Sequence, residues 1–459
     1  MSTKIDRLLE LLESNPEIAD ALLEAGEELA RVVNDVTPER PGDLGEIEEG
    51  IESTVDKVAR LALKKVLQRM APVASLVEHD GRVWRRAKDA TLGICFSRRG
   101  PVEFERHLYR DMSRRNGPTI APAEQVGGLI DGRWTPKAAE AVCDLLQKET
   151  AREAETTSAR LGILPYSAAA FGRVAELVGT EWDEHRAGIE NDLMASYEVS
   201  PETVAVSLAA DRVSVPMRAR IEGKFRMAYC GVVTLHDKDG EPLDSFRYGW
   251  MPKPTVSENL AEAMRGDLNA LMKKRPNLRI VVLSDGAHEM KGLLEQAVEG
   301  LDGVERALDF WHAVEHIAAV ARALGLDAKE EVRTAKATLL EHDDGAERLV
   351  QRVAGWGKRT RRREGKEEVR KALTYLQNNA DRMSYRRLRE ANLPIGSGHV
   401  EATCKTLVSV RMKRAGAQWS MVGGQAILGL RSLARSSRWD GGMKQLLGRW
   451  VKPVTVRAT

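Results

Sequence analysis

The sequence predicts an α/β protein whose mixed β-sheet is interrupted by an all-helical insertion and preceded by a mainly helical region with a β-hairpin. Residues 203–208, 225–235 and 246–250 are rich in the apolar and β-branched residues typical of strands. A helical pattern and then the apolar run LRIVVL at 278–283 follow, which indicates strands and helices packed in one α/β layer structure. The highly charged stretch 312–390 has helical spacing and no convincing strand.

Length and composition bound the class of protein. The chain has 459 residues, about three times the ~150 residues of a typical domain, so we expect two or three domains. Hydrophobic residues make up 42% and charged residues 30%, which excludes a wholly disordered chain. No apolar run reaches the ~18 residues of a spanning helix and the N-terminus is acidic, so we expect no membrane association and a cytoplasmic location. The four cysteines form no C-x-x-C pair, which argues against a zinc ribbon.

The N-terminal third is predicted to be mostly helical. Apolar residues recur every three or four positions over 4–33 and again over 51–67. Between them, residues 34–50 hold prolines, glycines and acids and are predicted to form a linker.

A β-hairpin and a helical pair are expected next. The turn of the hairpin is predicted at 98–101 (RRGP), with alternating residues on either side. Helices are predicted at 135–160 and 166–178, separated by a tight turn. This pattern fits a helix-turn-helix DNA reader and an ordinary helical hairpin equally well.

The two ends of the chain differ in charge. Residues 1–60 carry 6 Lys or Arg against 16 Asp or Glu, whereas residues 381–459 carry 15 against 4. This asymmetry predicts a basic surface for a polyanion near the C-terminus.

Three carboxylates are candidate site residues. Asp285 directly follows the apolar strand at 278–283, at the carboxyl end where open α/β sheets place reacting groups. Asp211 follows the first strand candidate, and Glu401 lies near the start of a predicted helix. Each alone also fits a structural role, such as capping a helix or favouring its dipole. Carboxylates that converge from two strands and a helix are able to hold two Mg²⁺ ions around a phosphodiester.

Four segments resemble a known family. They are ADRVSVPMR, VVLSDGAHEM, LDFWHAVEHI and PIGSGHVEATCKTLVSVRMKRAGAQWS, spread over about 203–433, roughly half the chain. They resemble DDE transposases of bacterial insertion sequences, in the Kra-type branch of the Mutator-like superfamily. The resemblance implies a ribonuclease-H-like sheet with an all-helical insertion between the second Asp and the Glu. The intervals of 74 residues from Asp211 to Asp285 and 116 from Asp285 to Glu401 agree with that order.

The resemblance also implies site residues. Asp211, Asp285 and Glu401 would be the catalytic DDE triad and would bind two Mg²⁺ ions, for which Mn²⁺ can substitute. The family's Asp-x-x-His motif, which helps to position DNA, maps onto Asp309 and His312. This chain departs from the family where Arg212 replaces the usual glycine after the first Asp, and where HLYRDMSRRNGPTIAP replaces a cysteine-rich knuckle.

Further residues are candidates for positioning DNA. Trp311 is adjacent to the Asp-x-x-His histidine and is able to stack on an unpaired base. Arg411, Lys413 and Arg414 follow the triad glutamate, and the basic run 358–363 lies in the insertion. These cations fit either solvated helix surface or contacts to the DNA backbone.

The implied activity is metal-dependent phosphodiester hydrolysis at transposon ends, followed by transfer of the 3′-OH strand into target DNA. The expected partners are double-stranded DNA, as terminal inverted repeats and as target, and further copies of the chain in a homodimer or larger assembly on DNA. The expected location is the bacterial cytoplasm, in association with the nucleoid.

The resemblance and the patterns together divide the chain into five parts. We expect an acidic helical region at 1–70, a hairpin and helix-turn-helix-like DNA-binding region at 71–200, and the first part of the catalytic core at 201–311. The helical insertion is expected at 312–392, and the second part of the core with a basic tail at 393–459.

Two other functions remain alternatives. His312, Glu315 and His316 satisfy H-x-x-E-H, a pattern of zinc metallopeptidases. A transposase-derived protein that binds DNA without cleaving it is the other alternative. The loop PIGSG at 394–398 lacks the Gly-Lys-Ser/Thr ending of a phosphate-binding loop, so we expect no nucleotide cofactor.

Overall fold

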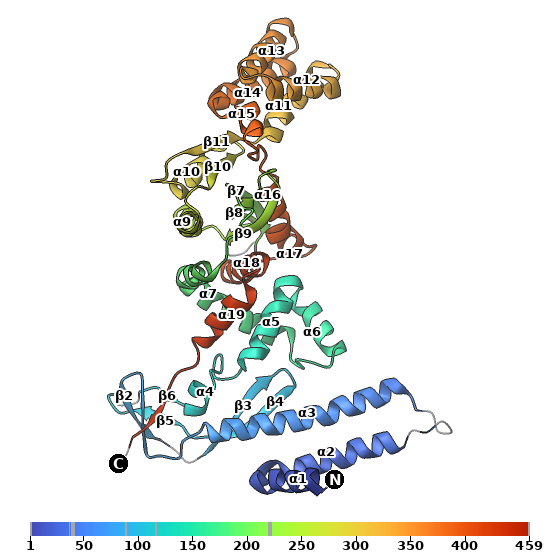
Figure 1. Ribbon diagram of the computed structural model, residues 1–459, viewed down its shortest axis with the longest axis vertical. Helices are drawn as coiled ribbons and strands as arrows, with labels where there is room; N and C mark the ends of the chain where they lie inside the picture. Colours follow the sequence, from blue (N-terminus) through green and yellow to red (C-terminus); the bar gives the residue numbers. More distant parts are fainter. Residues whose placement is uncertain are drawn as a thin grey trace. The chain divides into compact units, whose positions relative to one another are not determined.

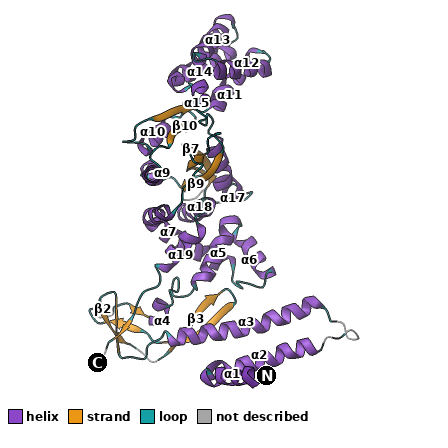
Figure 2. Ribbon diagram, viewed as in Figure 1, coloured by secondary structure: helices purple, strands orange, loops and turns teal. Residues whose placement is uncertain are grey.

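A computed structural model describes residues 2–35, 37, 42–87, 90–114, 117–218 and 223–457. The chain forms two compact units, one made of residues 1–178 and 443–459 and the other of residues 179–442. Both units contain helices and strands, which confirms the α/β class (Figure 2). No helix of the described residues is long and apolar enough to cross a bilayer.

The first unit begins with helices α1 (Ser2–Ser14), α2 (Pro16–Asn34) and α3 (Leu44–Arg69) (Figure 1), of which α1 and α2 carry more acidic than basic residues. Helix α3 begins earlier than predicted, within the expected linker, because the Asp43 side chain accepts hydrogen bonds from the Gly45 and Glu46 amides and caps the helix. The linker residues 36 and 38–41 lie outside the described residues.

The hairpin of the first unit is confirmed, but a five-stranded sheet beside it was not predicted. Strands β3 (Thr91–Ser97) and β4 (Gly100–Arg106) form the hairpin. The additional sheet has strands of only two to five residues, too short to show a period. Its strands, in spatial order, are β12 (Thr455–Val456), β1 (Leu76–His79), β2 (Arg82–Arg86), β5 (Tyr109–Asp111) and β6 (Thr119–Ile120).

The helices that follow differ from the prediction at their ends. After α4 (Pro122–Val126), the helix expected at 135–160 is split into α5 (Pro136–Lys148) and α6 (Ala151–Arg160). Thr150 and Glu153 form a capping box there, which starts a new helix. Helix α7 (Ala168–Ser196) extends 18 residues beyond its predicted end at 178 and continues into the second unit.

The second unit contains the predicted mixed sheet, in the order β11-β10-β7-β8-β9. Strands β7 (Ala205–Pro216), β8 (Phe225–His236) and β9 (Pro242–Trp250) form an antiparallel meander. Strand β10 (Arg279–Ser284) pairs parallel with β7, and β11 (Val304–Leu308) pairs parallel with β10.

Each face of this sheet has its own core. Alternate residues of β7 point to opposite faces, so Val206 and Leu208 pack with α9 (Val256–Lys274) and α10 (His288–Ala297). Ala205 and Ala209 belong to the core on the other face. That second core also includes residues of α16 (Gly398–Thr403), the π-helical segment η2 (Cys404–Ser409), α17 (Val410–Met412) and α18 (Met421–Arg435).

The predicted all-helical insertion follows β11. Leu349, Leu376 and Tyr385 are fully buried in its own hydrophobic core. Between β11 and α16, a fully described stretch, there is no strand. Its helices are α11 (Phe310–Leu324), α12 (Ala328–Glu341), α13 (Gly345–Arg359), α14 (Arg363–Asn379), η1 (Ala380–Arg382) and α15 (Tyr385–Glu390).

The chain ends with α19 (Trp439–Gly448) and β12. Val77 and Glu78 of β1 pair with β12. Residues 443–459 therefore belong to the first unit, whereas the sequence grouped all of 393–459 with the catalytic core.

Candidate functional site

Three aspartates lie level with one another at neighbouring strands of the second unit's sheet. Leu283 pairs with Ala209, and continuing this parallel register by two residues places Asp285 beside Asp211. Ser284 pairs with Leu308, and one step further Asp309 is level with Asp285. The Asp309 amide donates to the Ser284 carbonyl at 2.8 Å, which ties the two strand ends together.

The same three aspartates share the face of the sheet that α16 covers. Ala209, Leu283 and Ala307 each precede one of the aspartates by two residues, and all three belong to the core that contains Val400 and Cys404. Because side chains two apart on a strand point the same way, Asp211 lies on the face of the Glu401 helix, and Asp285 and Asp309 continue the same alternation.

Asp211 lies within a strand and not after one. The sequence predicted a strand that ended at residue 208, but β7 continues to Pro216 and pairs Asp211 with Cys230. The extension is explained by Val213 and Val215, which keep the alternation going and pack in the core.

The surroundings of Asp211 raise the pKa of its carboxyl. The residue is half-buried, and burial is the main cause that raises the pKa of its carboxyl. The negative charge of Asp285 raises this pKa further, while the Arg212 amide, which donates to Oδ1 at 2.6 Å, lowers it. Cys404 Sγ lies 3.8 Å from Asp211 Oδ2. A cation between the two aspartates would favour the charged form of Asp211.

Asp285 forms a tight turn after β10. Its Oδ1 accepts a hydrogen bond from the Ala287 amide at 2.9 Å, so the side chain stabilises the turn one residue before α10 begins. Gly286 has φ +91°, which a side chain would strain, and a Cβ there would lie 3.0 Å from Tyr375 Cε2. Glycine at position 286 is therefore required by the backbone geometry and by the close approach of α14.

The insertion holds this turn in place. The Tyr375 hydroxyl donates to the Asp285 carbonyl at 2.7 Å, and the Tyr375 ring stacks on His316 with centroids 3.9 Å apart. Arg382, which is 6% exposed, donates from Nη1 to Ser284 Oγ at 2.7 Å. The sequence did not predict that these residues hold the Asp285 turn, because Tyr375 and Asp285 are 90 residues apart and a local pattern gives no information about contacts at that separation.

Asp309 is fully buried and caps α11. Its Oδ1 accepts from the His312 amide at 2.8 Å and lies 3.2 Å from His312 Nδ1. Its Oδ2 accepts from the amide and hydroxyl of Ser397, the residue before α16. These hydrogen bonds lower the pKa of Asp309 to about 2 against the effect of its burial, and the Asp309 carboxylate raises the pKa of His312 to about 9.

Glu401 is exposed on the short helix α16. It lies one turn before Cys404, whose thiol contacts Asp211, and next to the buried Val400. Its helix thus packs against the strand that carries Asp211. The oxygens of Asp211, Asp285 and Glu401 do not all come within 4.8 Å of one another, since the described residues hold a single group of three such ligands, which lies elsewhere.

The remaining candidates differ in exposure. Trp311 is 52% exposed, with Lys336 Nζ 4.2 Å from its ring centroid. Lys413 and Arg414 are exposed in the turn after α17. Arg411 is only 5% exposed, and its guanidinium lies 4.9 Å from the Trp419 ring centroid, so most of its side chain packs in the interior.

The H-x-x-E-H residues do not form a metal site of three protein ligands. His312 is paired with Asp309, and His316 is stacked on Tyr375. Burial is the main cause that lowers the pKa of His316. Neither histidine belongs to a group of three potential ligand atoms within 4.8 Å in the described part of the chain.

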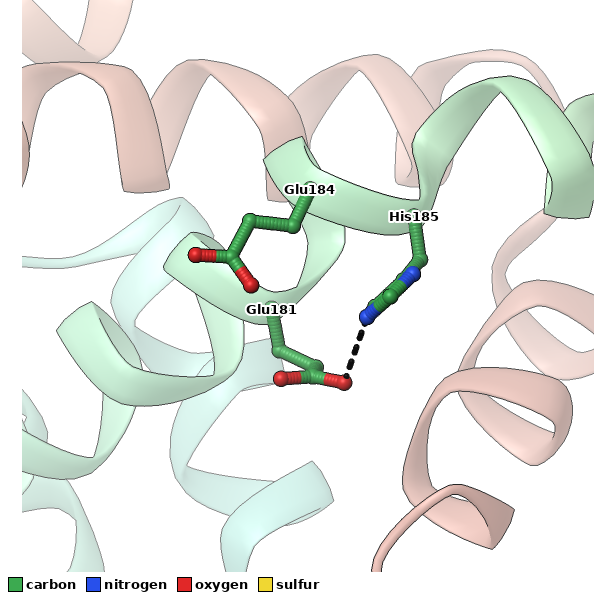
Figure 3. A group of neighbouring side chains, drawn as sticks. All are labelled: Glu181, Glu184 and His185. Atoms are coloured by element: carbon green, nitrogen blue, oxygen red, sulfur yellow. Dashed lines mark ion pairs between the residues drawn. The ribbon is translucent and has the colours of Figure 1, made fainter.

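The one group of three ligands in the described residues is Glu181, Glu184 and His185 of α7 (Figure 3). The spacing places all three on adjacent turns of one helix face, and His185 Nε2 lies 3.1 Å from Glu181 Oε1. The sequence did not suggest this group because the helix was predicted to end at residue 178. The group is partly exposed, and its Glu-His contact also fits an ordinary surface ion pair.

No family model matches the chain, and no curated protein matches it.

Proposed function

We propose that this protein is a DDE-type DNA transposase that hydrolyses phosphodiesters at transposon ends and joins the released 3′-OH to target DNA. The observation that carries the proposal is the level placement of Asp211 and Asp285 on adjacent parallel strands, with the Glu401 helix packed on the same face. The sequence resemblance assigns catalytic roles to these same three residues.

The order of the elements supports the same proposal. A mixed five-stranded sheet is followed by an all-helical insertion and then by the Glu401 helix. This is the order implied by a ribonuclease-H-like transposase with its insertion between the second Asp and the Glu. We include that fold in the proposal.

The donor atoms suit Mg²⁺. Asp211 and Asp285 offer hard carboxylate oxygens, and their like charges repel each other in a half-buried setting. Two Mg²⁺ ions, when bound, would neutralise these charges and stabilise the attacking and leaving oxygens of the phosphodiester. Asp211 and Asp285 would hold them from the sheet, and Glu401 would approach from α16.

Other residues would set the geometry. Tyr375 and Arg382 fix the Asp285 turn, and Asp309 joins the end of β10 to the loop before α16. The partner would be double-stranded DNA that carries either the terminal repeats of the transposon or the target site. Two or more copies of the chain would bind to one DNA assembly.

Two measurements on the full-length protein test the proposal. The first is Mn²⁺ binding by electron paramagnetic resonance, and the second is Mg²⁺-dependent nicking of a plasmid that carries the DNA flanking the coding region. Asp211→Asn, Asp285→Asn and Glu401→Gln should each abolish nicking while duplex DNA is still bound. Asp302→Asn, an exposed aspartate in the loop after α10, is the control and should nick normally.

The outcomes separate the candidate functions. A Glu401→Gln protein that still nicks would refute the triad. DNA binding without nicking by the unaltered protein would favour a DNA-binding protein derived from a transposase. Zinc bound stoichiometrically and lost in His316→Ala would favour the metallopeptidase.

A further inference from the structure

The helical insertion contains a groove with an excess of positive charge. The groove has a volume of about 810 Å³ and is lined by the end of α11, the start of α12, the last turns of α13 and the loop to α14. Arg352, Arg359, Arg361 and Arg362 line it, and Glu331 is its one acidic lining residue. Glu331 is already paired with Arg352, at 2.5 Å.

Three of the groove arginines lack the ion pairs that several other arginines of the insertion form. Arg333, Arg348 and Arg370 each pair with a carboxylate one helical turn away, at 2.6 to 2.7 Å. Arg359, Arg361 and Arg362 have no carboxylate within 4.0 Å among the residues that the structure describes. Arg359 Nε donates only to the Gly355 carbonyl, at 3.2 Å.

The local structure explains why these charges stay unpaired. Arg359 is the last residue of α13, and the residues three and four positions after it are Arg362 and Arg363. Arg361 and Arg362 lie in the loop before α14, outside the helical geometry that pairs Arg333, Arg348 and Arg370 with their carboxylates. Clustered unpaired guanidinium groups repel one another, which costs stability unless a polyanion covers them.

The wall of the groove favours a duplex over a single strand. Trp356 lines the groove but is only 9% exposed, with the Arg352 guanidinium 5.6 Å from its ring centroid. Proteins that bind single strands present exposed aromatic faces on which bases stack. A groove with guanidinium groups and a covered indole fits a phosphate backbone, which arginine contacts through its planar fork of donors.

We propose that this groove binds the phosphate backbone of double-stranded DNA, with Arg359, Arg361 and Arg362 as the contacts. The inference rests on the proposed function for its ligand, but it concerns a surface separate from the three carboxylates. It gives the insertion a second role, in holding DNA, beside its support of the Asp285 turn.

The test compares two triple variants of the full-length protein that remove the same number of positive charges from the helical insertion. One is Arg359→Ala with Arg361→Ala and Arg362→Ala; the control is Arg333→Ala with Arg348→Ala and Arg370→Ala. Binding of a fluorescent 40-base-pair duplex is measured by anisotropy over a series of salt concentrations. Each phosphate contact contributes about 0.9 to the slope of log K against log salt, so the groove variant should flatten the slope by about two to three units. The control should keep the parent slope.

A second measurement needs no substitution. Trypsin cleaves after exposed arginines, so the loop at 360–362 should be cut in the free protein and protected by saturating duplex. Equal cleavage with and without duplex would overturn the proposal, as would an unchanged salt slope in the groove variant. Weaker self-association of the groove variant with an unchanged slope would also overturn it, and would assign the groove to the acidic N-terminal helices of another copy.

Failure of the inference and failure of the proposed function give different results. If the groove variant binds DNA like the parent and the parent nicks DNA, only the groove assignment is wrong. If the parent neither binds nor nicks DNA, the transposase proposal itself is wrong, and the groove loses its ligand with it.

Discussion

Asp309 joins three parts of the site through a single buried carboxylate. It caps α11, pairs with His312 and accepts two hydrogen bonds from Ser397, the residue before the Glu401 helix. A buried carboxylate is costly unless it is fully hydrogen-bonded, and here each oxygen has a partner. The Asp-x-x-His pair therefore has a structural role that holds whether or not it contacts DNA.

The charge of this pair predicts a pH dependence. The pKa of His312 is raised to about 9, so its contribution to stability is complete below the ordinary histidine pKa of about 6.5 and is lost as pH rises through about 9. The pKa of Asp309 is lowered to about 2, so its contribution persists until pH falls toward that value. The stability advantage of the parent over His312→Gln should shrink between pH 7 and 10.

Thermal unfolding midpoints of the two proteins, measured across that range, check this prediction. His342→Gln removes an exposed histidine at the end of α12 and is the control. If the difference in unfolding midpoint between the parent and His312→Gln stays constant up to pH 10, the imidazolium is not bound to Asp309.

At the scale of elements, helices of the insertion and of the C-terminal part hold the segments next to the candidate site residues in place. Helix α14 presents Tyr375 to the Asp285 turn, and α18 presents Arg431 to η2. Tyr375 and Arg431 both donate to backbone carbonyls, those of Asp285 and Leu407. They therefore hold the backbone of the Asp285 turn and of η2 in place without contacting the carboxylates.

Tyr375→Phe should lower the rate of DNA nicking while the protein stays folded. The change removes the hydroxyl that donates to the Asp285 carbonyl but keeps the ring that stacks on His316. Loss of one neutral hydrogen bond is worth about 1 kcal/mol, so we expect a rate about five- to tenfold lower and weaker Mn²⁺ binding. Tyr197→Phe, which removes a hydroxyl bonded to Asp244, is the matched control. Equal nicking by the two variants would contradict a positioning role for Tyr375.

Arg431→Met should destabilise the second unit. Arg431 is 1% exposed, and its guanidinium donates to the Leu407 carbonyl at 2.6 Å and to the Thr406 carbonyl. A π-helical segment leaves carbonyls without their usual partners, and methionine would leave these two buried and unsatisfied. We expect a loss of about 3 kcal/mol of unfolding free energy.

Chemical denaturation measures this loss, with Arg435→Met, at the last turn of the same helix, as the control. An Arg431→Met protein as stable as the parent would show that η2 satisfies its carbonyls by itself.

At the scale of the whole molecule, everything assigned to catalysis lies in one unit. The cores on both faces of the mixed sheet and the core of the insertion draw only on residues between 179 and 442. A unit with its own cores is expected to fold independently.

A fragment of residues 179–442 should therefore unfold cooperatively and bind Mn²⁺ with an affinity close to that of the full chain. Calorimetry and Mn²⁺ titration measure the two properties. A fragment that shows no cooperative transition would mean that the N-terminal unit is needed to complete the fold. The matching fragment with Asp285→Asn controls for Mn²⁺ bound elsewhere.

The sequence by itself determined the order of strands and helices in the second unit and the three carboxylates worth testing. Long periodic segments and the strand LRIVVL report their own structure, because side-chain period and burial are local properties. Only the tertiary structure decided that Asp211, Asp285 and Asp309 are level, since strand register depends on pairing between segments 24 to 74 residues apart. It also decided that Arg411 is interior and that Tyr375 supports Asp285, because burial and contact at long separation are properties of packing and leave no periodic trace in the chain.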